Sequence, residues 1–234
     1  MAKKLEGRRV LITGASRGIG YTTTRLFLKE GASVIGVGKD ETRLKDASKE
    51  FEKYGDFTYV VADLSKKGFE KNIINIVEKK WNALDILVNN AGVMLAYGGF
   101  LDDKDGIIEE TFQVNLFAPY YLVKAMVPFL LKGKEPRIIN VSSGAGQFDA
   151  LKLTDIASYR VSKFALNGFT ILLSNELKGK ISVNALDPGW VKTDLGGNQA
   201  PGDPEDSAKG ALAIATLPFE ISGKFFKDGK EIPF

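Results

Sequence analysis

The chain of 234 residues contains no cysteine and no histidine. Without cysteine it can form neither a disulfide nor a catalytic thiolate. Because histidine is absent as well, a zinc site built on His or Cys ligands and a Ser-His-Asp triad are both excluded. Any acid–base chemistry must therefore use tyrosine, lysine or a carboxyl group.

Strong charge and long apolar runs are also missing. The 32 basic and 29 acidic side chains leave a net charge of +3, which is too small to favour nucleic acid or an anionic membrane as a partner. The longest apolar stretch, Leu122 to Leu131, is interrupted by Lys124 and Pro128 and is far shorter than the ~20 residues that cross a bilayer. The charged N-terminus, Met1 to Arg9, lacks the apolar core of a signal peptide. We expect a cytoplasmic protein with no membrane partner.

Short β-branched runs alternate with longer helical patterns along the chain. The length suits one domain over residues 1–234. The alternation predicts a doubly wound α/β fold of the Rossmann type, with a mostly parallel seven-stranded sheet and helices on both faces. The expected strands are Arg9–Thr13, Ser33–Val37, Phe57–Val61, Asp85–Asn89, Arg137–Val141, Ile181–Ala185 and Gly223–Phe226. The expected helices are Gly18–Lys29, Glu41–Lys53, Gly68–Trp81, Val114–Leu131, Ala157–Leu177 and Pro204–Thr216.

A glycine-rich turn, Thr13-Gly14-Ala15-Ser16-Arg17-Gly18-Ile19-Gly20, follows the first strand. Its spacing differs from G-x-G-x-x-G, but its glycines would let the backbone approach a pyrophosphate at the start of the next helix. The alternative is a tight strand–helix turn that binds nothing. In a parallel sheet ligands bind beyond the carboxyl ends of the strands, where Asn90, Ser143 and Pro188 are also expected.

The residues after the second strand favour NADP over NAD. An acidic residue there would bind the ribose 2′-hydroxyl and repel a 2′-phosphate, but this chain has Gly38-Lys39. Arg17 adds a second cation from the glycine turn. Asp40 would weaken the preference if its carboxylate turned inward.

Three side chains predict proton transfer at a carbonyl group. Tyr159 and Lys163 share one helical face at Tyr-x-x-x-Lys spacing, and Ser143 precedes them. A lysine ammonium would lower the pKa of the tyrosine from ~10, and the serine would orient the carbonyl oxygen. The same spacing occurs at Tyr120 and Lys124, which we interpret as packing because no polar strand end precedes them.

Taken in order, these motifs resemble the classical short-chain dehydrogenase/reductase family, and in particular its cytosolic NADPH-dependent carbonyl reductases. The resemblance runs from about residue 7 to about residue 195. It rests on the glycine turn, Asp63-Leu64, Asn89-Asn90-Ala91-Gly92, Asn115, Ser143, Tyr159 with Lys163, and the segment from Pro188 to Asp194.

The resemblance implies roles for individual residues. Asn115, Ser143, Tyr159 and Lys163 would be catalytic, with Asn115 anchoring a water that links Lys163 to solvent. NADP(H) would contact Tyr159, Lys163 and the following residues: Gly14, Ser16, Arg17, Gly18, Ile19, Gly20, Lys39, Asp63, Leu64, Asn90, Ala91, Gly92, Pro188, Gly189, Val191 and Thr193. No metal is implied, and family members are often homodimers or homotetramers. The interval from Ser143 to Tyr159 is longer than usual, so residues 147–154 should form an extra loop.

These observations predict an NADPH-dependent reductase of a ketone or aldehyde, acting on a small carbonyl or alcohol substrate and on no nucleic acid. The sequence also fits a non-catalytic dinucleotide-binding regulator, because a fold alone does not prove activity. A third alternative is the same enzyme working mainly as an alcohol dehydrogenase.

Overall fold

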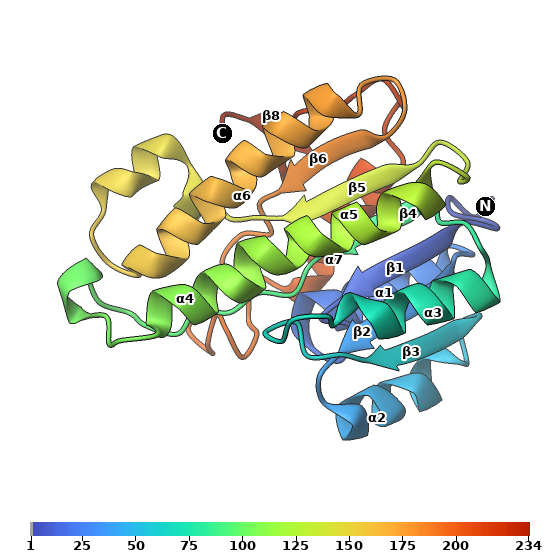
Figure 1. The fold of residues 1–234 in the computed structure, drawn as a ribbon, viewed down its shortest axis with the longest axis horizontal. Helices are drawn as coiled ribbons and strands as arrows, with labels where there is room; N and C mark the ends of the chain where they lie inside the picture. The colour runs from blue at the N-terminus through green and yellow to red at the C-terminus, as the bar shows by residue number, and fades with distance from the viewer. Residues whose placement is uncertain (1) are drawn as a thin grey trace.

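The computed structural model describes residues 2–234 and contains one sheet of eight strands in that range, in the order β3-β2-β1-β4-β5-β6-β7-β8 (Figure 1). Neighbours from β3 to β7 pair in parallel, and β8 is antiparallel to β7. The strands are β1 Arg9–Thr13, β2 Ser33–Gly38, β3 Phe57–Val61, β4 Ile86–Asn89, β5 Arg137–Val141, β6 Ser182–Leu186, β7 Phe225–Lys227 and β8 Lys230–Ile232.

The eighth strand corrects the prediction of seven. Asp228 and Gly229 join β7 to β8, and both have positive φ, at 48° and 73°. Asp-Gly favours such two-residue turns between antiparallel strands, so the sequence did carry a signal for this hairpin.

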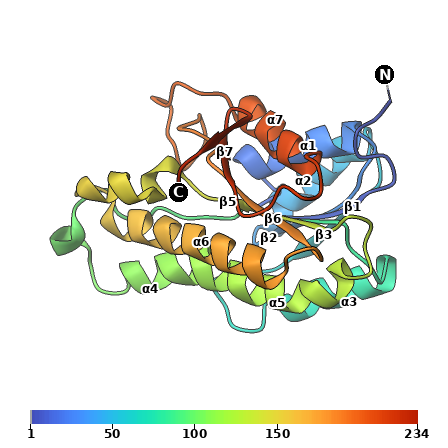
Figure 2. The same cartoon turned by 90° about the horizontal axis from the view of Figure 1, so that it is seen from above.

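Helices cover both faces of the sheet, as predicted. Figure 2 shows α1 (Gly18–Lys29), α2 (Glu41–Phe51) and α7 (Pro204–Ala215) on one face. The other face carries α3 (Glu70–Lys80), α4 (Ile107–Phe112), α5 (Ala118–Leu130) and α6 (Ala157–Glu176). Apolar strand residues such as Val10, Leu11 and Ile12 are fully buried between the layers, which explains why the strands read as continuous apolar runs.

The helix predicted over Val114–Leu131 is interrupted. A π-helical turn over Gln113–Phe117, labelled η2, joins α4 to α5, and α4 was not predicted. Such turns often occur at functional sites, because they locally shift a side chain out of the regular helical register. Here the turn contains Asn115, which is fully buried.

The extra loop expected over residues 147–154 contains a short 3-10 helix, Phe148–Lys152, and another one, Gly144–Gly146, precedes it. The start of α6 contacts the loop after β4, since Ala157 N–H donates to the Gly98 carbonyl at 3.2 Å. Across residues 2–234, the helices are all too short or too polar to span a membrane.

Candidate active site

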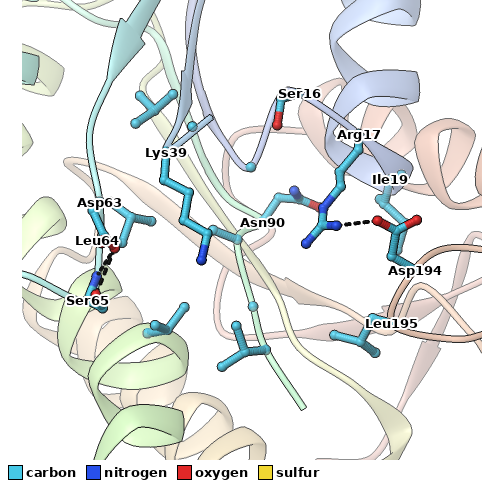
Figure 3. Close-up of a pocket in the computed structure, with 18 of the residues that line it drawn as sticks. Ser16, Arg17, Ile19, Lys39, Asp63, Leu64, Ser65, Asn90, Asp194 and Leu195 are labelled. Atoms are coloured by element: carbon cyan, nitrogen blue, oxygen red, sulfur yellow. Dashed lines mark hydrogen bonds and ion pairs between the residues drawn. The ribbon is translucent and has the colours of Figure 1, made fainter. Parts of the chain in front are cut away.

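A cleft opens where the sheet order reverses, between the ends of β1 and β4 (Figure 3). It lies beyond the carboxyl ends of the strands, where doubly wound sheets bind ligands. Of the predicted cofactor contacts, those that line it are Gly14, Ser16, Arg17, Gly18, Ile19, Lys39, Asp63, Leu64, Asn90, Ala91, Gly92 and Thr193.

The glycine turn is shaped as the sequence predicts. Gly14 and Gly18 have positive φ, at 71° and 55°, a conformation that other residues rarely adopt. A Cβ at Gly20 would lie 2.2 Å from the Gly14 carbonyl oxygen, so only glycine allows the helix to start this close to the strand. The turn therefore brings the first residues of α1 directly to the cleft.

The start of α1 suits a phosphate group. No side chain caps it, and its first turn contains no acidic residue. The free N–H groups and the positive end of the helix dipole therefore face the cleft without a competing anion from that turn. The residues present thus fit a dinucleotide pyrophosphate.

Two basic side chains, Lys39 and Arg17, line this cleft. Figure 3 shows Lys39 extending into it and Arg17 pointing toward Asp194, with which it forms an ion pair. Arg43 Nη1 also lies 3.4 Å from the Asp194 carboxylate. Asp40 is engaged elsewhere, because its carboxylate caps α2 by accepting from Arg43 N–H at 3.0 Å. In this structure Asp40 does not add the inward-facing carboxylate that would weaken a preference for NADP.

Asp63 keeps its charge at the edge of the cleft. Burial opposes its ionisation, but hydrogen bonds from the Ser65 N–H and hydroxyl and the charge of Lys39 outweigh this and lower the pKa of Asp63.

Asn90, which follows β4, joins two strands at the cleft. Its Nδ2 donates to the Thr13 carbonyl at 2.8 Å and links β4 to β1. The Asp63 and Asn90 side chains thus hold the cleft walls in place.

Asn115 and Lys163 meet behind the cleft at Gly92. A Cβ at Gly92 would lie 3.4 Å from both Asn115 Oδ1 and Lys163 Nζ, so glycine leaves room for the two polar groups. The Asn115 amide is occupied by Val93, whose N–H donates to Oδ1 at 2.8 Å and whose carbonyl accepts from Nδ2 at 2.9 Å. Lys163 Nζ donates to the Val141 carbonyl at 2.9 Å.

Tyr159 and Lys163 lie on α6 beside Ser143, at the end of β5. Burial raises the pKa of Tyr159 to about 12, although a hydrogen bond with Ser143 acts in the opposite direction. Burial lowers the pKa of Lys163 to about 8. The Lys163 ammonium lies 5.6 Å from the centre of the Tyr159 ring and donates to Val141 instead of the phenol. The expected lowering of the Tyr159 pKa by Lys163 is therefore not observed.

The second Tyr-x-x-x-Lys pair has different surroundings. Tyr120 is 47% exposed and Lys124 is exposed on the outer side of α5, whereas Lys163 is only 3% exposed. Tyr120 packs against Phe169 of α6, with ring centroids 5.4 Å apart. Burial, which the spacing does not encode, distinguishes the two pairs.

Six predicted cofactor contacts lie outside the cleft lining. Gly20 packs behind Gly14, Tyr159 and Lys163 lie on α6, and Pro188, Gly189 and Val191 lie in the segment after β6. Several residues that were not predicted also line the cleft: Val37, Gly38, Ala62, Ser65, Val93, Glu110, Val114, Asp194 and Leu195. Most of these residues are next to a predicted contact in the sequence, so their position along the chain could have indicated that they line the cleft. No such neighbour indicated Glu110, because it lies on the unpredicted helix α4.

The chain is similar to known proteins in both sequence and fold. The sequence model of short chain dehydrogenases matches residues 8–203. The 3-oxoacyl-[acyl-carrier-protein] reductase FabG of Thermotoga maritima is 34% identical over 197 residues, covering 82% of this chain and 77% of that protein. The solved NADPH-bound carbonyl reductase from chicken fatty liver is 30% identical, with a TM-score of 0.88 over 98% of this chain and 100% of that one. The NADP complex of RhlG from Pseudomonas aeruginosa is 27% identical, with a TM-score of 0.87 over 97% of each chain.

The family match covers most of the chain, and the eight-stranded, mostly parallel α/β fold agrees with it. The glycine turn lines the cleft, Ser143 follows β5, and Tyr159 and Lys163 lie on α6. The chain belongs to the short-chain dehydrogenase family.

Proposed function

We propose that this protein is an NADPH-dependent reductase of the carbonyl reductase type, which converts a ketone or an aldehyde to the alcohol. The observation that carries the proposal is the position of Tyr159, on α6 beside Ser143 and Lys163, at the same sheet edge as the dinucleotide cleft. This combination supports a role for Tyr159 as a proton donor next to the site that fits the cofactor.

The basic side chains that line the cleft support NADP(H) as the cofactor. Lys39 and Arg17 would hold the 2′-phosphate, and the glycine turn with the start of α1 would hold the pyrophosphate. The similar chicken carbonyl reductase and RhlG structures contain NADPH and NADP. When bound, the nicotinamide supplies the hydride for the carbonyl carbon.

The protein's own residues would bind and protonate the carbonyl oxygen. Ser143 would donate a hydrogen bond to that oxygen and fix its orientation. Tyr159 would then transfer its hydroxyl proton as negative charge develops there. Burial keeps the pKa of Tyr159 raised, at about 12, so the hydroxyl carries its proton at neutral pH and can donate it. Lys163 and Asn115 would return the proton, and Lys163 would also hold the nicotinamide ribose.

The substrate would be a small apolar carbonyl compound. Large apolar side chains near the sheet edge stay open to solvent, including Tyr97 (70% exposed), Phe148 (68%) and Trp190 (61%). Small-molecule sites are mostly lined by such side chains, with a few polar groups that orient the ligand. A hydrophobic ketone, aldehyde or quinone would therefore be bound between these side chains and Ser143.

The test is NADPH oxidation with a panel of aromatic aldehydes and diketones. Tyr159→Phe should lower kcat by at least about 100-fold, because it removes the proton donor, and should leave the Kd for NADPH nearly unchanged. Tyr120→Phe, in the other Tyr-x-x-x-Lys pair, is the matched control and should keep full turnover. Full turnover in Tyr159→Phe would disprove the role of Tyr159. Tight NADPH binding without turnover of any substrate would favour the regulator instead.

We also propose a cytoplasmic homodimer or homotetramer that uses the outer faces of α5 and α6. These helices lie side by side (Figure 1) and expose Tyr121, Val161 and Leu172, and Phe117 is exposed in the π-helical turn just before α5. Patches of this kind on a soluble protein often mark association surfaces. Analytical ultracentrifugation of the wild type and of Leu172→Glu tests it; a monomeric wild type would contradict the proposal.

A further inference from the structure

One buried charge near the active site has no part in the mechanism above. Asp187 follows β6 directly and is 4% exposed, although aspartate is rarely buried unless it is paired. It is not among the residues that line the cofactor cleft. A buried carboxylate costs free energy unless nearby groups compensate it, so its contacts need an explanation.

The Asp187 carboxylate contacts three segments. Its Oδ1 accepts a hydrogen bond from Gly189 N–H at 3.0 Å, within the turn after β6. Its Oδ2 lies 3.2 Å from Nζ of Lys227 on β7. A Cβ at Gly144 would lie only 2.8 Å from the same oxygen, so the carboxylate packs closely against the turn that begins with Ser143.

We propose that Asp187 is a positioning residue of the catalytic site, which holds the turn after β6 against the turn that contains Ser143 and sets the charge that faces the Tyr159 hydroxyl. Lys227 is its counter-charge and links the β7–β8 hairpin to the same site. This inference rests on the proposed role of Tyr159 as the proton donor.

Groups from three elements act on Tyr159. Lys163 of α6 lies 5.6 Å from the centre of the Tyr159 ring, and the pKa of Tyr159 responds to Ser143 in the turn after β5 and to Asp187 in the turn after β6. Burial is the main cause that raises the Tyr159 pKa, Ser143 opposes it, and the Asp187 charge raises it further. Lys227 from β7 partly offsets that charge. Asp187 thus resists formation of the phenolate and keeps the proton on Tyr159 as the pH rises.

The experiment is a tyrosinate absorbance titration of Asp187→Asn and Lys227→Met, each measured as the difference from the same variant with Tyr159→Phe added. Asparagine keeps an oxygen that can accept from Gly189 N–H and removes only the charge. Asp187→Asn should lower the Tyr159 pKa by roughly 0.5 to 1 pH unit. Lys227→Met should raise it, because the carboxylate then loses its counter-charge. The high-pH limb of kcat/KM should move in the same two directions.

A purely structural role would lower kcat in both variants and leave the titration unchanged, and that result would overturn the proposal. Shifts of the same sign in the two variants would also overturn it. If Asp187→Asn does not fold, Lys227→Met on the exposed hairpin still tests the charge effect alone. An unchanged Tyr159 pKa in Lys227→Met would contradict the proposal. If the titrations shift as expected while Tyr159→Phe keeps full turnover, the proposed function fails but the placement of the Asp187 charge beside Tyr159 stands.

Discussion

Replacing Lys163 with methionine should stabilise the cofactor-free protein at neutral pH, even though it removes a proposed catalytic group. The lysine side chain is 3% exposed, and its burial lowers its pKa from 10.5 to about 8. A folded protein that holds this ammonium in its interior loses stability, because the same group is fully hydrated in the unfolded chain. Methionine has a similar unbranched shape and carries no charge.

The size of the effect follows from the two pKa values. Their difference corresponds to about 3 kcal/mol against the folded state below pH 8. Methionine also loses the 2.9 Å hydrogen bond from Nζ to the Val141 carbonyl, which costs about 1 kcal/mol. The net gain at pH 7 is about 2 kcal/mol, or roughly 4 to 8 °C in Tm for a chain of this size.

The folding stability of the wild type should change with pH in the opposite direction from that of a protein whose lysine is paired with a carboxylate. Between pH 8 and 10.5 the unfolded chain binds a proton at Lys163 that the folded protein does not, so the wild type becomes more stable as the pH rises. The advantage of the methionine variant should therefore disappear by about pH 10.5. Tyr159, whose pKa is raised to about 12, contributes stability that is complete below pH 10 and is lost towards pH 12. This contribution is common to both proteins and largely cancels.

Urea unfolding of the cofactor-free proteins at pH 7 and pH 10 measures the difference. Lys124→Met is the matched control: Lys124 is exposed in the other Tyr-x-x-x-Lys pair, so its replacement should change stability by less than about 0.5 kcal/mol at both pH values. A Lys163→Met protein that is less stable than the wild type at pH 7 would refute the reasoning. So would a stability difference that is the same at both pH values.

Three further predictions concern the cofactor and the substrate. Lys39→Asp should lower the ratio of kcat/KM for NADPH to that for NADH by about tenfold or more, since a carboxylate repels the 2′-phosphate; an unchanged ratio would contradict the ribose assignment. Ser143→Ala should lower kcat by about 100-fold and leave the Kd for NADPH nearly constant, and equal losses in both would assign Ser143 the wrong role. Asp194→Asn should tighten NADPH binding by about 3-fold in a fluorescence titration and leave NADH binding unchanged, because the Asp194 carboxylate pairs with Arg17 and Arg43 across the cleft. Weaker NADPH binding by this variant would mean that Asp194 supports the site.

Local patterns in the sequence determined most of the secondary structure. The strand at Arg9–Thr13 and the helix at Gly18–Lys29 have the predicted bounds, because an apolar run and a glycine turn act over a few neighbouring residues. Many residues around the cleft could also be predicted from their positions just after the strands, because parallel strands bring their carboxyl ends to one edge of the sheet. The missed hairpin at β7–β8 had a local signal in Asp228-Gly229, which shows that short edge strands are easily overlooked.

Only the tertiary structure decided the charges around the catalytic group. Two Tyr-x-x-x-Lys pairs have the same spacing, and burial alone makes Lys163 unlike Lys124. Asp194 reaches Arg17 from 177 residues away, and Asp187 is buried against the Ser143 turn from another strand. The pKa of a side chain depends on desolvation and on charges brought close by folding, and neither quantity is present in the order of residues along the chain.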